Sequence, residues 1–109
     1  MESYGNSIPR INSQMLERQK GNVVRLVGKV LQSQDNAVVV EASDQGQVNV
    51  TLSSQSNLDV GSYYDIIGRV DENLVISEMN LGDFGNDMDL AAYDKMVVIA
   101  QSFPDIFGW

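Results

Sequence analysis

The sequence predicts a small all-β barrel of five strands, flanked by a short N-terminal helix and a C-terminal amphipathic helix. Three observations support this prediction. Apolar and polar residues alternate with a period of two through most of residues 23–81, which is typical of strands with one buried face. A polar segment, residues 53–61, separates the third strand from the fourth and is longer than a hairpin loop. Near the C-terminus the period becomes helical, so one structural domain is expected.

An N-terminal segment, residues 1–22, precedes the barrel in this interpretation. Within it, Asn12 can cap a short helix through the stretch SQMLERQ, which ends at residues 21–22. The first ten residues lack the apolar core of a secretory signal, and no run is long enough for a membrane span. An intracellular protein is therefore expected.

The barrel is expected at residues 23–82. A meander of three strands is expected first, and a hairpin of two strands follows the polar segment. The expected strands are residues 23–32, 37–42, 47–52, 63–70 and 73–81.

Two glycines lie within strands rich in branched residues, Gly28 in LVGKV and Gly68 in IIGRV. Glycine weakens a strand unless a bend or a close backbone approach requires it, and coiling a five-stranded sheet requires such positions. The strand order and these glycines favour the oligonucleotide/oligosaccharide-binding barrel, or OB-fold. An SH3-like barrel is the competing fold, although it would need a different position for the long loop and no terminal helix.

Composition excludes much chemistry. The chain has 109 residues, 7 basic and 15 acidic side chains, a formal net charge of -8, and neither histidine nor cysteine. Imidazole bases, cysteine nucleophiles and the usual zinc sites are therefore absent from the sequence. The carboxylate-rich stretch DFGNDMD lacks the glycine of a calcium loop, so we interpret it as a linker and helix cap. The sequence predicts no catalytic residue, no metal site and no cofactor.

The usual ligand face of an OB-fold is poorly equipped here for single-stranded nucleic acid. Such a face carries aromatic platforms and a positive surround. The expected outward positions of the second and third strands are neither aromatic nor basic: Ala37, Val39, Glu41, Gln47, Asn49 and Thr51. The weak candidates for phosphate contacts are Arg25, Lys29 and Arg69, although ordinary solvated strand residues are the simpler interpretation.

The C-terminal part, residues 83–109, is expected to form a linker and an oligomerisation helix from an Asp87 cap to about Phe103, before Pro104. Two apolar stripes run along this helix: Leu90, Tyr93, Val97 and Ala100 form one, and Ala92, Met96, Ile99 and Phe103 form the other. Asp94, Lys95, Gln101 and Ser102 are expected on the far side. One stripe can close the barrel and the other is left for a partner, and the sequence does not decide which is which. The alternative is that both stripes are buried in the chain's own core.

At this point the chain resembles the small subunit of replication protein A, the eukaryotic heterotrimer that binds single-stranded DNA. The matching stretches are PRINSQML, VRLVGKV, YDIIGRV and DLAAYDKMVVIAQSFPDIF, which cover both ends and two strands in the right order. The resemblance implies an OB-fold whose terminal helix joins one helix from each of the large and middle subunits in a three-helix bundle. It also implies that those subunits supply most of the DNA contact.

The function expected from this resemblance is that of a non-enzymatic assembly subunit, nuclear, and active in DNA replication, repair and recombination. All eight stripe residues are candidates for the subunit interface. One alternative is a free-standing OB module that binds a short single strand or another small ligand. A weaker alternative is a carboxylate-based hydrolase, which would need two adjacent carboxylates in a pocket.

Overall fold

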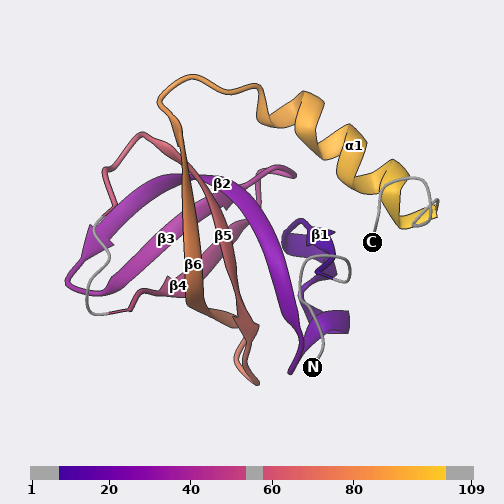
Figure 1. Cartoon of the computed structure of the whole chain (residues 1–109), viewed down its shortest axis with the longest axis horizontal. Coiled ribbons are helices and arrows are strands. Elements are labelled where there is room, and N and C mark those ends of the chain that lie inside the picture. The colour runs from indigo at the N-terminus through magenta and orange to yellow at the C-terminus, as the bar shows by residue number, and fades with distance from the viewer. Residues whose placement is uncertain (1–7, 54–57, 103–109) are drawn as a thin grey trace.

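The computed structural model describes residues 8–53 and 58–102 of the chain. Its strands form one six-stranded sheet in the order β1-β2-β3-β4-β6-β5, and an additional pairing of β2 with β5 closes the sheet into a barrel (Figure 1). The strands are β1 (Arg10–Ile11), β2 (Val23–Gln34), β3 (Ala37–Ala42), β4 (Gln47–Thr51), β5 (Tyr63–Val70) and β6 (Val75–Gly85).

The barrel is closed at two seams and filled by branched side chains. β2 pairs with β5 in antiparallel register from Val23 opposite Arg69 to Lys29 opposite Tyr63. β4 pairs with β6 in parallel over three residues, beginning with Asn49 opposite Val75. The alternating positions of each strand point inward, as the period of two predicts. The fully buried strand residues of the core include Val24, Leu26, Val30, Val40, Ile66, Val70 and Ile76.

The N-terminal segment differs from the predicted short helix. It contributes strand β1, which pairs in parallel with β2, and two short 3-10 turns, η1 (Ser13–Met15) and η2 (Glu17–Gln19). Asn12 lies at the predicted N-cap position of η1, but its side chain makes no cap hydrogen bond. The Asp44 carboxylate caps the turn instead, accepting hydrogen bonds from the Ser13 amide at 3.2 Å and the Gln14 amide at 3.1 Å.

Gly28 and Gly68 both lie where neighbouring backbone approaches too closely for a side chain. A Cβ atom at Gly28 would lie 2.5 Å from the Glu41 carbonyl oxygen, on the adjacent strand β3. A Cβ atom at Gly68 would lie 2.6 Å from Ile76 Cγ2 and closer still to a carbonyl oxygen of β6. The register of β5 against β6 also shifts between Ile67 and Gly68, as in a β-bulge. The predicted close approach is therefore confirmed at both glycines.

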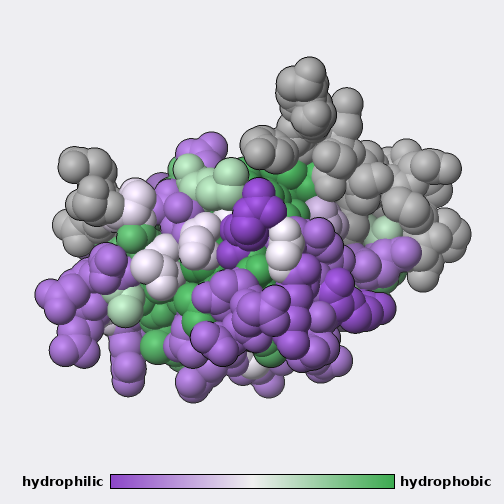
Figure 2. Space-filling model, turned by 90° about the horizontal axis from the view of Figure 1, so that it is seen from below, coloured by the Kyte–Doolittle hydropathy of each residue, from purple (hydrophilic) through white to green (hydrophobic). Residues whose placement is uncertain are grey.

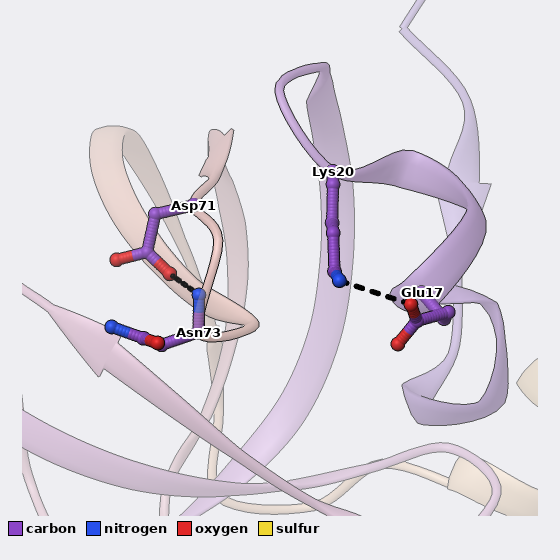
Figure 3. Close-up of polar contacts among 4 residues, drawn as sticks. All are labelled: Glu17, Lys20, Asp71 and Asn73. Atoms are coloured by element: carbon purple, nitrogen blue, oxygen red, sulfur yellow. Dashed lines mark hydrogen bonds and ion pairs between the residues drawn. The ribbon is translucent and has the colours of Figure 1, made fainter.

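The C-terminal elements begin and end at other residues than predicted. The turn after β5 is organised by Asp71, whose carboxylate accepts a hydrogen bond from the backbone amide of Asn73 at 2.8 Å (Figure 3). It also accepts one from the Val75 amide at 2.9 Å. β6 consequently starts at Val75 and continues to Gly85, into the predicted linker.

The terminal helix α1 (Leu90–Ser102) is capped by Asp89, because the Asp89 carboxylate accepts the Ala92 amide at 3.1 Å. Asp87 lies before this cap and the prediction that it caps the helix is wrong. The predicted last residue, Phe103, lies outside the described residues.

Candidate functional site: the two faces of the terminal helix

α1 lies beside the N-terminal segment at one side of the barrel, where it contacts β1 (Figure 1). One of its apolar stripes faces the rest of the chain. Val97 and Ala100 are fully buried, and Tyr93 is half-buried against the hydrophobic core. Leu90, at the first turn, is also half-buried. The structure thus decides what the sequence left open, namely which stripe the barrel covers.

Polar side chains hold α1 at the edge of this buried stripe. Asp94 Oδ1 accepts a hydrogen bond from Asn12 Nδ2 at 2.9 Å and one from Ser43 Oγ at 2.7 Å. Two turns later, Gln101 Nε2 donates to the Arg10 carbonyl oxygen at 3.1 Å. The prediction that Asp94 and Gln101 lie on the far side of the helix is therefore wrong.

The sequence already indicated that Asp94 and Gln101 lie on the same side of the helix. Asp94 and Gln101 are seven residues apart, so they share one side of the helix and flank the stripe that contains Val97. What the sequence did not contain is the position of the groups they bind, Asn12 and Ser43 for Asp94 and the Arg10 carbonyl oxygen for Gln101, because these come from distant segments that only the folded chain brings together.

A small cluster of ionisable groups surrounds Tyr93. Arg25 Nε and Asp65 Oδ1 form an ion pair at 3.4 Å between β2 and β5. Burial raises the pKa of the Asp65 carboxyl above its usual value, and the positive charges of Arg25 and Arg10 only partly oppose that shift. Burial also raises the pKa of the Tyr93 hydroxyl to about 12, against the smaller opposing effect of Arg10. A tyrosine hydroxyl is neutral at physiological pH even at its usual pKa, so this shift affects the stability of the chain only at high pH.

The opposite face of α1 is exposed and largely apolar. Val98 is 51% exposed and Ile99 is 50% exposed, and Ala92 is exposed beside them. Met96 is half-buried between the two faces, and Phe103 lies outside the described residues. The second predicted stripe is thus the one that the barrel leaves uncovered. Val98 is exposed as well, but it lies about 100° around the helix axis from Ile99, outside both predicted stripes.

The outer surface of β3 and β4, the usual ligand face of the predicted fold, carries a groove of about 320 Å³. The six positions of β3 and β4 that the sequence placed on the outer surface are all exposed or half-buried, as predicted. Among the described residues, those that line the groove bear no charge: they are Gln32, Gln34, Ala37, Val38, Val39, Asn49, Val50, Thr51 and Val75. A polyanion would find no cation in this groove.

The three candidate phosphate contacts lie elsewhere on the barrel, on β2 and β5. Arg25 is paired with Asp65. Lys29 is half-buried and stands opposite the acidic residue Glu41 in the β2–β3 register. Arg69 is exposed and donates to the Gly21 carbonyl oxygen at 2.7 Å. They do not converge on the β3–β4 groove.

A second groove, of about 380 Å³, lies at the end of the barrel near Arg69, Gly21 and Pro9. Lys20, on the neighbouring turn, forms an ion pair with Glu17 at 3.0 Å (Figure 3).

The face seen from below in Figure 2 is mostly hydrophilic, with apolar residues visible between polar ones. No helix within residues 8–53 and 58–102 has the length and apolarity needed to cross a membrane.

Sequence comparisons with known proteins indicate one family. Residues 1–107 match the family described as Replication factor A protein 3. Replication factor A protein 3 of Schizosaccharomyces pombe is 26% identical over 99 residues, which cover 91% of this chain and 93% of that protein. A 14 kDa subunit of replication protein A from Arabidopsis thaliana is 28% identical over 91 residues, 84% of each chain.

A solved structure gives the same result for the fold. A chain in the structure of U. maydis replication protein A bound to single-stranded DNA superposes with a TM-score of 0.90 at 29% identity, and the match covers 100% of both chains. The predicted OB-fold is thereby confirmed, with one more strand than the five expected. Sequence and structure together show that this chain belongs to the Replication factor A protein 3 family, as its resemblance to the small subunit of replication protein A indicated.

Proposed function

We propose that this chain is a non-catalytic assembly subunit of replication protein A, and that the exposed face of α1 joins the large and middle subunits. The observation that carries the proposal is the division of the helix into two faces. Val97 is buried in the chain, whereas Val98 and Ile99 are each about half exposed. An exposed apolar strip on a helix is the feature expected of a helix-bundle partner.

The complex acts in the nucleus, in DNA replication, repair and recombination. Within it, most of the DNA contact comes from the large and middle subunits. The acidic net charge of -8 and the uncharged β3–β4 groove support this division of labour. Arg25, Lys29 and Arg69 supply at most auxiliary phosphate contacts, because Arg25 and Arg69 already bind groups of the chain itself.

Co-expression with the two larger subunits tests the interface. Val98→Glu combined with Ile99→Glu should abolish co-purification of the complex, because two charges would be buried in the bundle. The melting temperature of the isolated chain should change little, since both side chains are half exposed. Val60→Glu is the matched control: Val60 is 61% exposed but lies on the barrel, before β5. Retained assembly of the double variant, or equal loss with Val60→Glu, would refute the proposed interface.

Titration of labelled single-stranded DNA with the isolated chain tests the assignment of DNA contact. Binding at physiological salt should be no tighter than the roughly 10⁻⁴ M end of non-specific affinity. Micromolar binding with a steep salt dependence that Arg69→Ala weakens would instead make this chain a direct DNA-binding subunit.

A further inference from the structure

We propose that Asp94 is a positioning residue that fixes the rotation of α1 about its own axis, and thereby selects which apolar stripe remains available outside the barrel. The inference concerns the chain alone and holds whichever partner the exposed stripe meets. It rests on the two hydrogen bonds that Asp94 Oδ1 accepts, from Asn12 Nδ2 at 2.9 Å and from Ser43 Oγ at 2.7 Å.

Burial of apolar surface alone does not determine this rotation. Within α1 both stripes are apolar, since Met96 and Ile99 in one are together about as bulky as Tyr93 and Val97 in the other, and the stripe centres are separated by roughly 110° around the helix axis at 3.6 residues per turn. Turning α1 by about a third of a revolution would therefore cover Met96 and Ile99 in place of Val97. The hydrophobic effect is non-directional and distinguishes poorly between two such arrangements.

The polar groups beneath the helix do distinguish them. Asn12 is only 3% exposed and Ser43 only 4% exposed, so neither side chain can exchange a lost partner for bulk water. In the alternative rotation, the helix positions above them would be those of Tyr93 and Ala100, which offer no carboxylate. Two buried donors would then lose their acceptor, a cost that the observed rotation avoids.

Two further features support the assignment. Gln101, on the same side of α1 two turns later, donates to the Arg10 carbonyl oxygen at 3.1 Å and opposes the same rotation. The partners also come from two separate segments, the start of the chain and the turn between β3 and β4. A helix anchored to two independent segments cannot turn without breaking at least one contact.

Acceptor geometry carries the effect, and charge does not. Both hydrogen bonds end on the same oxygen, Oδ1, so a side-chain amide at this position could accept both. Asp94→Asn should consequently preserve the rotation, whereas Asp94→Ala should release it. Lys95→Ala, at the adjacent exposed position, is the matched control on the same helix turn.

Thiol labelling of the full chain tests the proposal, and the absence of native cysteine makes single-cysteine variants unambiguous. Val97→Cys and Val98→Cys place the probe at adjacent valines that are 0% and 51% exposed. Ala42→Cys, at a residue that is 0% exposed inside the barrel, reports opening of the barrel itself. The labelling rate of each cysteine would be measured in four proteins: one with Asp94 intact, and one each with Asp94→Ala, Asp94→Asn and Lys95→Ala.

With Asp94 intact, Cys at position 98 should react fast and Cys at position 97 slowly. Asp94→Ala should raise the labelling rate at position 97 by at least about tenfold and leave the rate at position 42 unchanged. The reason is that α1 loses its contacts with the barrel while the barrel itself stays folded. Asp94→Asn and Lys95→Ala should leave all three rates as they were. Protection at position 97 that survives Asp94→Ala would overturn the proposal, and so would parallel exposure at positions 97 and 42, which would make Asp94 a general stabiliser of the barrel.

Discussion

The two strand glycines give a sharp test of how the barrel is closed. We expect Gly28→Ala and Gly68→Ala to destabilise the chain, although each adds only one methyl group. At Gly68 the new Cβ atom would lie 2.6 Å from Ile76 Cγ2, well inside van der Waals contact, and closer still to the Ser77 carbonyl oxygen. Backbone cannot yield as a flexible side chain does, so β5 and β6 would have to separate.

The expected magnitude follows from two opposing effects. Alanine restricts the unfolded chain more than glycine does, which stabilises a compatible site by about 0.4–1 kcal/mol. Overpacking costs about 1–3 kcal/mol when backbone must shift. The net loss at Gly28 or Gly68 should therefore be about 1–2 kcal/mol, or roughly 5–10 °C in melting temperature for a domain of this size.

Gly82→Ala is the matched control, because Gly82 lies in the same β5–β6 pair but its Cβ atom would meet Asp65 Cβ at 3.5 Å, an ordinary contact. This variant should be neutral or slightly more stable. Urea unfolding of the three variants, followed by circular dichroism, measures the difference. Equal stabilities for Gly68→Ala and Gly82→Ala would refute the argument that close approach of β6 requires glycine at position 68.

Two further predictions concern the side chains that anchor the N-terminal segment and α1. Because the pKa of Tyr93 is about 12 in the folded chain and 10.0 when unperturbed, its contribution to stability is complete below pH 10 and is lost as the pH rises through 12. After allowance for partial exposure, the free energy of unfolding at pH 11 should fall by about 1 kcal/mol more in the native sequence than in Tyr93→Phe. The same pH dependence of unfolding in both proteins would contradict this prediction. Asp44→Ala should lower the free energy of unfolding by about 1–2 kcal/mol, as loss of a helix cap does, and Asp44→Asn should lower it less because one acceptor oxygen remains; equal losses would show that the cap depends on charge.

The sequence by itself determined the strands of the barrel and the two glycines at which neighbouring strands approach closely. Alternation with a period of two places the same side of β2, β3 and β5 in the core, because successive strand residues point to opposite faces whatever the tertiary context. The glycines at positions 28 and 68 were informative for a similar reason, since a residue that weakens a strand indicates a close approach. The same alternation predicted that the outward positions of β3 and β4 carry no basic side chain, and the groove on that surface has none in its lining.

Only the tertiary structure decided how the ends of the chain are arranged. Strand β1 has two residues, too few to show any period, and it exists because β2 offers a free edge beside it. The cap predicted at Asn12 was chosen from its neighbours in sequence, whereas the N-terminal turn takes its acceptor from Asp44, about thirty residues away.

The orientation of α1 belongs to the same class. Its two apolar stripes are nearly equivalent along the sequence, and the choice between them depends on hydrogen bonds from Asn12 and Ser43 to Asp94 that span 82 and 51 residues. The periodicity of the sequence predicts which side of a helix is apolar, because that is a local property of the chain. It cannot record which buried donors lie beneath the helix, because their positions are set only when the barrel has closed.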